Sequence, residues 1–114
     1  MEKIVEQGML YDFYGELLTP HQRKIYEDVV FNDMSLSEIA EEQGISRQGV
    51  HDLVKRCDQT LKGYEEKLHL VERFIAIREK VGEIDTLLDG YEQKNTAEIV
   101  EKIRKISGEI IEEL

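Results

Sequence analysis

The stretch LSEIAEEQGISRQGVHDLV, residues 36–54, decides the fold that this chain is expected to adopt. A helix-turn-helix needs two short helices with apolar inner faces and a tight turn between them. Gly44 supplies the turn, because glycine most easily takes the left-handed conformation that follows a helix. The apolar residues expected to meet between the two helices are Ile39, Ala40, Ile45, Val50 and either Leu53 or Val54. This spacing predicts a helix-turn-helix and is more specific than a single short pattern.

Capping signals place the neighbouring helices. Ser35, with Glu38 three residues later, is a capping box that opens the first helix of the motif, and Ser46 opens the second. Upstream, the run Thr19-Pro20-His21-Gln22 has a capping threonine, a proline where no backbone donor is needed and a glutamine that closes the box. The sequence therefore predicts a first helix over residues 3–18 and a second that ends near residues 32–33.

The C-terminal half is expected to consist of helices with apolar seams. One seam runs through residues 50–75 with spacings of four and three, so a single helix is predicted to cross Gly63 without a break. A second seam continues through residues 70–88 and should stop at Gly90. Asn95 then caps a last helix, whose isoleucine stripe is Ile99, Ile103, Ile106 and Ile110. Seams of this kind favour packing of helix against helix, within the chain or with a second copy.

Length and composition set the class of the protein. The 114 residues suit one domain, or a compact head with a helical extension, and leave no room for a separate catalytic domain. We place the helix-turn-helix head in residues 1–62 and the helical extension in residues 63–114. A single proline and 35% charged residues favour an all-α fold. We expect a strandless three-helical core of the winged-helix type, with the long helix and the C-terminal helix packed as a small bundle.

Charge points to a candidate binding face. The chain carries a formal net charge of −10, which argues against a protein that coats nucleic acid nonspecifically. Residues 47–64 nevertheless hold four basic residues against two acidic ones, and this one basic island coincides with the second helix of the motif. The side chains predicted to bind nucleic acid are Arg47, Gln48, His51, Asp52, Lys55, Arg56 and Lys62. Arginine and glutamine at the start of such a helix suit base edges, whereas the later basic residues suit phosphates.

The residues also resemble known families. The segment LTPHQRKIYEDVVFNDMSLSEIAEEQGISRQGVHDLVKRCDQTL is similar to the region 4 helix-turn-helix of sigma factors. Most of the chain, and ISRQGVHDLVKR above all, resembles the YlxM family of small bacterial proteins. That resemblance implies a regulatory or adaptor protein associated with the signal recognition particle, its RNA or its expression. It leaves open whether the target is DNA or RNA.

Other function classes have less support in the sequence. Cys57 is the only cysteine and lies on an apolar seam, which predicts a buried structural thiol. We expect no catalytic residues, no bound metal and no cofactor, because no phosphate loop, nucleophile arrangement or paired metal motif is present. The longest apolar runs are far too short for a membrane span, so a cytoplasmic protein is expected.

Two expectations concern partners. The apolar seams predict a homodimer through the C-terminal helices. Such a dimer places two recognition helices at a fixed spacing. The competing interpretation is a protein-interaction module of the targeting or transcription machinery that touches no nucleic acid. Its support is the net charge of −10.

Overall fold

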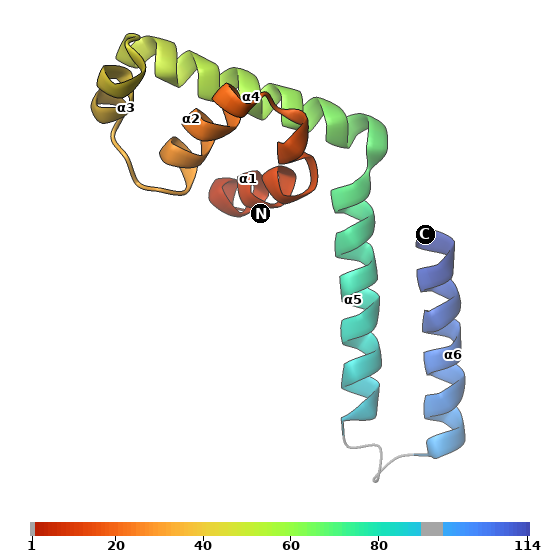
Figure 1. Cartoon of the computed structure of the whole chain (residues 1–114). Helices are drawn as coiled ribbons and strands as arrows, with labels where there is room; N and C mark the ends of the chain where they lie inside the picture. The colour runs from red at the N-terminus through yellow and green to blue at the C-terminus, as the bar shows by residue number, and fades with distance from the viewer. Residues whose placement is uncertain (1, 90–94) are drawn as a thin grey trace. The chain divides into compact units, whose positions relative to one another are not determined.

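The computed structural model describes residues 2–89 and 95–114, and every element among them is helical. In chain order these elements are α1 (Lys3–Tyr14), η1 (Gly15–Leu17), α2 (Pro20–Val30), α3 (Leu36–Gln43), α4 (Arg47–Leu68), α5 (Leu70–Leu88) and α6 (Thr96–Glu113) (Figure 1). The all-α class is therefore confirmed. Contacts divide the chain into a first unit, residues 1–69, and a second unit, residues 70–114, whereas the sequence-based division after residue 62 falls inside α4.

Local capping fixes where the helices begin. The Thr19 hydroxyl accepts from the Gln22 amide at 3.2 Å while the Gln22 side chain accepts from the Thr19 amide at 2.9 Å, so the predicted capping box is complete. Ser35 caps α3 by accepting from the Glu38 amide at 3.1 Å, although its hydroxyl, and not its backbone amide, donates to the Glu38 carboxylate. Asn95 caps α6 by accepting from the amides of residues 97 and 98.

The core of the first unit lies where α2, α3 and α4 meet. Ile25, Ile39 and Val50 each expose 1% or less of their surface, and Ala40 is buried beside them. The half-buried residues packed around this cluster are Val29, Met34, Leu36, Leu53 and Val54. In Figure 1, α1, α2 and α3 lie along one side of α4. Ile39, Ala40 and Val50, with Leu53 and Val54 around them, therefore join the two motif helices as expected. Ile45 was also expected to meet them, but it lies in the turn and is 39% exposed.

Gly44 makes the turn between α3 and α4. Its φ of 68° and ψ of 30° place it in the left-handed region, where a Cβ atom is strained. The amide of Ile45 donates to the Ala40 carbonyl at 3.1 Å, which closes the end of α3 in the manner of a Schellman motif. Ser46 then caps α4 by accepting from the Gly49 amide at 2.9 Å. Three residues thus end one helix and begin the next.

The long helix α4 crosses Gly63 as predicted but does not continue along the whole seam. It ends at Leu68, and His69 adopts the left-handed conformation with φ of 57° before α5 begins. Histidine is among the non-glycine residues that tolerate this conformation best. Apolar spacing carries no information about such a break, because the seam resumes in register on the next helix. The predicted first helix is likewise divided, into α1 and η1.

A buried tyrosine ties α4 to the two N-terminal helices. Tyr26 is fully buried, and its hydroxyl donates to the Asp58 carboxylate at 2.6 Å. The Gln7 side-chain amide donates to both Asp58 oxygens at 3.1 Å, so one carboxylate on α4 joins α1 and α2. The ring of Tyr11 stacks on that of Tyr26, with centroids 5.6 Å apart. This polar contact fixes the rotation of α4 about its axis, because the partners require Asp58 to face inward.

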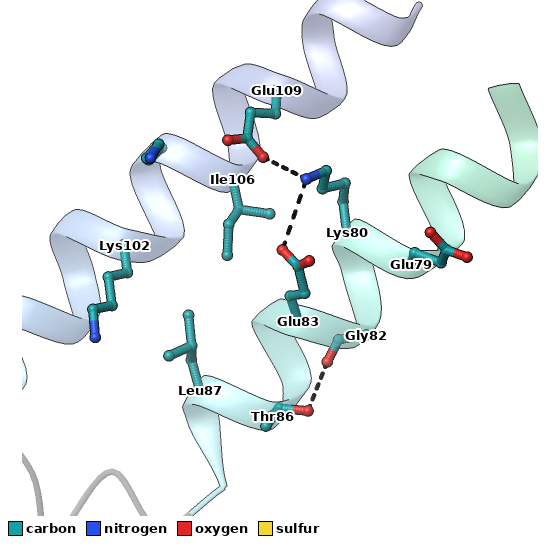
Figure 2. Close-up of a pocket in the computed structure, with 10 residues that line it drawn as sticks. Glu79, Lys80, Gly82, Glu83, Thr86, Leu87, Lys102, Ile106 and Glu109 are labelled. Carbon is teal, nitrogen blue, oxygen red and sulfur yellow. Dashed lines mark hydrogen bonds and ion pairs between the residues drawn. The ribbon is translucent and has the colours of Figure 1, made fainter.

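The second unit is the helical pair α5 and α6, which pack side by side (Figure 1). Ile99 and Ile106 are buried, and Ile103 and Ile110 are half-buried, so the predicted isoleucine stripe of α6 is its packed face. Lys80 on α5 forms an ion pair with Glu109 on α6 at 2.8 Å, and Figure 2 shows Leu87 and Ile106 pointing between the two helices. The predicted helix stop at Gly90 lies outside the described residues.

Gly44→Ala tests the turn. We expect the variant to lose about 1–2 kcal/mol of unfolding free energy, because alanine pays the steric cost of a left-handed residue. Gly63→Ala is the matched control: it lies within α4 with nothing within 4 Å of an added Cβ, and should stabilise by about 0.5–1 kcal/mol. Urea unfolding followed by circular dichroism measures both. Equal effects of the two substitutions would contradict the assigned role of Gly44.

Tyr26→Phe tests the polar anchor of α4. We expect a loss of about 2 kcal/mol near neutral pH, because the variant removes a hydrogen bond to a charged group. Burial, followed by the hydrogen bond to Asp58, raises the pKa of Tyr26 above its ordinary value of 10.0. A raised folded-state pKa gives stability that is complete below pH 10.0 and is lost as the pH rises above it. The urea midpoint should therefore fall less steeply above that pH in the variant than in the parent chain.

The control for the tyrosine is Tyr64→Phe. Tyr64 is half-buried, and its hydroxyl makes no hydrogen bond to any residue in the described part of the chain. We expect a change below about 0.5 kcal/mol for this variant, as for ordinary surface substitutions. If Tyr26→Phe behaved like this control at every pH, the Tyr26 to Asp58 contact would not anchor α4.

Candidate nucleic-acid interface

The outer face of α4 carries the predicted binding residues. All seven are exposed, and we call them together the exposed α4 face: Arg47, Gln48, His51, Asp52, Lys55, Arg56 and Lys62. The opposite face of the same helix holds the buried residues Val50, Cys57 and Leu61. One helix therefore contributes to the core on one side and presents polar side chains on the other. Their part in binding stays a prediction.

Basic residues of the exposed α4 face are aligned along the helix. Arg47, His51 and Lys55 are spaced by four residues, and Lys62 follows seven residues later, so all four lie near one line on the surface. At 1.5 Å per residue this line extends over about 22 Å. It begins at the first turn of α4, where unpaired backbone amides favour a negative charge. The line is long enough to follow several phosphates of a nucleic-acid backbone.

The lysines and arginines of the exposed α4 face are not neutralised by ion pairs among the described residues. Among the described residues, Arg47, Lys55, Arg56 and Lys62 make no ion pair with a carboxylate. Elsewhere lysines are paired, as in Lys24 with Asp28, Lys80 with Glu109, and Lys102 with Glu98. The exposed α4 face therefore keeps its positive charges available to an external anion.

Asp52 works against this positive charge. Its carboxylate accepts a hydrogen bond from the Gln48 side-chain amide at 3.0 Å and lies 3.6 Å from Nδ1 of His51. Gln48 is thereby held along the helix surface, with one of its two amide hydrogens engaged. The sequence placed all three residues on the binding face but gave no sign that they contact one another. The structure makes Asp52 a partner of Gln48 and His51 within the chain.

A hollow between the beginnings of α3 and α4 adds one residue that sequence reasoning missed. Its lining comprises Leu36, Ser37, Ser46, Arg47, Gln48 and His51. Ser37 is exposed in the first turn of α3, so two helix N-termini and a free hydroxyl border the same space as Arg47. The capping serines Ser35 and Ser46 predicted both N-termini. Their proximity depends on the crossing of the helices, which the sequence does not specify.

A second hollow in the first unit is largely apolar. Residues of α1, α2, α3 and α4 line it, and the apolar ones are Ile4, Val29, Val30, Leu36 and Val54. Lys3, His51 and Lys55 line the same hollow, so Lys3 of α1 joins two residues of the exposed α4 face. Lys3 was another residue that the sequence did not identify, because nothing local connects the start of α1 to the middle of α4.

The buried ionisable groups of the first unit serve the fold. Burial raises the pKa of the Cys57 thiol, so the sulfur stays protonated, and the expected buried cysteine is confirmed. Asp28 is 2% exposed, accepts from the Asn32 side chain at 2.9 Å and lies 3.1 Å from the Lys24 ammonium. The Asn32 hydrogen bond, with help from Lys24, lowers the pKa of Asp28. These partners keep the carboxylate charged and hold the end of α2.

Comparison with known proteins supports the helix-turn-helix geometry. Residues 1–106 match the family described as "Putative helix-turn-helix protein, YlxM / p13 like". The chain belongs to the UPF0122 family. A UPF0122 protein of Desulforamulus reducens is 43% identical over 112 residues, covering 98% of this chain and 96% of the relative. One from Thermoanaerobacter sp. is 46% identical over 91% of this chain and 90% of its own length.

The UPF0122 relationship extends to a less similar sequence. A UPF0122 protein of Bacillus cereus is 39% identical over 108 residues, which cover 93% of this chain and 98% of the relative. The similarity therefore includes both units of the chain, and the resemblance to the YlxM family is confirmed. Within residues 2–89 and 95–114, no helix combines the length and apolar character needed to cross a bilayer.

Asp52→Asn tests the electrostatics of the exposed α4 face. We expect affinity for a duplex DNA probe to rise about threefold to tenfold at low salt, because one repulsive charge is removed at the surface. The neutral side chain still offers an oxygen to Gln48, so the geometry is retained. Glu101→Gln removes an equal charge from an exposed position on α6 and should leave the affinity unchanged. Fluorescence anisotropy at several salt concentrations measures both, and equal gains would mean that only net charge matters.

Proposed function

We propose that the first unit binds nucleic acid through the exposed α4 face and that the protein acts as a regulator or adaptor rather than as an enzyme. The observation that carries this proposal is the helix-turn-helix whose second helix presents unpaired cations while its other face is buried in the core. Family membership supports it, since the family description is that of a helix-turn-helix protein.

Duplex DNA is the target that the geometry favours. An α-helix is about 10–12 Å across with its side chains, and the major groove of B-DNA is about 12 Å wide. The major groove of A-form RNA is too narrow for such a helix, so RNA would contact only the phosphate-binding residues. In this arrangement Arg47 and Gln48 face base edges, and Lys55, Arg56 and Lys62 follow the backbone. Ser37 and the two helix N-termini beside it add phosphate contacts.

The net charge of −10 limits how tightly this surface binds without sequence recognition. Three phosphate contacts correspond to a slope of about −3 in a plot of log affinity against log salt. Such a protein binds weakly to random DNA and depends on matched bases, on a second binding unit or on a protein partner. The charge thus favours a selective regulator over a general coat of nucleic acid.

The wider context of the function is part of the same proposal. The resemblance to the YlxM family supports a role connected with the signal recognition particle, with its components as partners. We also propose that the protein works in the cytoplasm, needs no cofactor and forms a homodimer through its C-terminal helices. A pull-down from the native cytoplasm, analysed for RNA and protein, tests the connection to the particle.

The apolar hollow of the first unit favours a second candidate function. Ile4 is 49% exposed at its edge, and Val29, Val30 and Val54 line it. Apolar hollows of this kind accept side chains from a partner helix. In this alternative the first unit binds a protein of the targeting or transcription machinery and makes no contact with nucleic acid. Lysines at the rim, Lys3 and Lys55, would then favour an acidic partner.

The triple variant Arg47→Ala, Lys55→Ala, Arg56→Ala separates the two candidates. If nucleic acid is bound, we expect a loss of affinity of at least tenfold at low salt, since the variant removes a base contact and two phosphate contacts. The salt slope should be smaller by about two units, because Lys55 and Arg56 each account for about one and Arg47 faces base edges. The matched control is the triple alanine variant of Lys102, Arg104 and Lys105 on α6, which changes the net charge equally. It should retain the parental slope.

The measurements use duplex DNA, signal recognition RNA and the cognate particle protein in parallel titrations at several salt concentrations. If the affinity for nucleic acid changed neither with salt concentration nor with the α4 substitutions, the phosphate-contact model would be excluded. Ile4→Asp at the apolar hollow provides the reciprocal test. Loss of particle-protein binding with unchanged nucleic-acid binding in that variant would favour the interaction module.

A further inference from the structure

The two long sides of the second unit differ in chemistry. One side is an open groove between α5 and α6, whose lining includes Lys80, Glu83, Lys102, Lys105 and Glu109 (Figure 2). Six of its ten lining residues are charged, and the ion pair from Lys80 to Glu109 crosses it at 2.8 Å. The opposite side is formed by the residues on the other flank of each helix.

Helical geometry gives the composition of that opposite side on α5. Ile77 and Ile84 are half-buried. Because a helix turns about 100° per residue, positions three and four residues further on fall on opposite flanks of this line. Three residues on are Lys80 and Leu87, which line the charged groove. Four residues on are Val81 and Leu88, which are 45% and 49% exposed.

The same relation holds on α6. Ile99 and Ile106 are buried, and the residues three positions on, Lys102 and Glu109, line the charged groove. Four positions on are Ile103 and Ile110, both only half-buried. The charged flanks of α5 and α6 line the same groove. Their other flanks therefore lie together on the opposite side of the helical pair. We call this the apolar side: Val81, Leu88, Ile103, Ile110 and Val100, the last of which is 50% exposed.

A pair of helices with one apolar side resembles half of a four-helix bundle. Each helix is about 27 Å long and about 10 Å across, so the apolar side measures about 540 Å² in projection. Two such sides bury about 1,100 Å² in total, which is close to the lower end of the range for stable protein interfaces, about 1,200 Å². Aliphatic residues with branched side chains fill it, as is usual between the helices of a bundle.

Charges beside the apolar side indicate that a second copy is the partner. Arg78 and Asp85 each lie one residue beyond the half-buried isoleucines, so they occupy equivalent positions at the edge of this side, seven residues apart. A twofold axis across α5 between residues 81 and 82 brings Arg78 of each copy opposite Asp85 of the other. Isologous contacts require this kind of self-complementarity. The edge of α5 therefore matches itself in the antiparallel orientation.

We propose that two copies of this chain associate through the apolar sides of their second units, forming an antiparallel four-helix bundle in which Val81 lies beside the twofold axis. This deepens the homodimer of the proposed function by assigning its surface, orientation and edge contacts. It does not depend on whether the exposed α4 face binds DNA. The charged groove remains on the outside of the bundle, and α5 of one copy pairs with α5 of the other.

Val81→Lys in the full-length chain tests the assignment. Sedimentation equilibrium of the parent chain should give twice its 13.3 kDa mass at high micromolar concentration, and the variant should raise the dissociation constant of the dimer at least tenfold. Thr86→Lys places the same charge on the groove flank of α5 and should leave the dimer intact. Far-ultraviolet circular dichroism confirms that both variants keep their helices. A monomeric parent chain, or equal effects of the two lysines, would overturn the proposal.

Two further variants test the orientation. Val81→Cys should form a disulfide-linked dimer under mild oxidation, because the residue lies beside the twofold axis and Cys57 is buried; Thr86→Cys should not. Arg78→Asp and Asp85→Arg should each weaken the dimer a few-fold, and the two together should restore it. Failure of this restoration would reject the antiparallel register. Anisotropy with a DNA probe that holds one binding site is measured separately, so loss of DNA binding and loss of the dimer are distinguished.

Discussion

The packing of Val50 against Ile39 and Ile25 is the constraint on which the rest of the structure depends. Val50 is the first buried residue of α4, and its contact sets the angle at which α4 leaves α3. Gly44 makes this angle accessible by ending α3 in the left-handed region within three residues of the next helix. Once these residues are in place, the outward direction of Arg47 and His51 follows from helix geometry alone. The candidate interface is thus a consequence of the core.

Much of this architecture could be predicted from particular residues. Thr19, Ser35, Ser46 and Asn95 all cap the helices that follow them. These caps are predictable because a short polar side chain just before a helical apolar pattern accepts a hydrogen bond from the backbone amides of the first turn. Gly44 is likewise explained by the left-handed turn that ends α3. Periodicity identified the inner faces of α3, α4 and α6. These signals are local, since each depends on residues within one or two helical turns.

The parts that escaped prediction depend on contacts between distant residues or on single backbone conformations. The break at His69 leaves the apolar period intact, so no pattern announces it. Lys3 and Ser37 join the surroundings of the candidate interface only because α1 and α3 pack near α4. Asp52 was assigned to the interface by position, but its hydrogen bond to Gln48 depends on rotamers. A sequence predicts the helix face on which a side chain lies more readily than the residue that the side chain contacts.

One face of α4 contributes Val50, Cys57 and Leu61 to the core, and the other exposes Lys55. Binding at the outer face and the stability of the core are therefore coupled through one helix. Any anion retained by the outer face restrains the same backbone that closes the hydrophobic interior. Thermodynamic linkage then converts occupancy into resistance to heat, by about 2.7 kcal/mol at a ligand concentration one hundred times the dissociation constant. The melting temperature of the first unit would consequently report how much of an added anionic ligand the outer face of α4 binds.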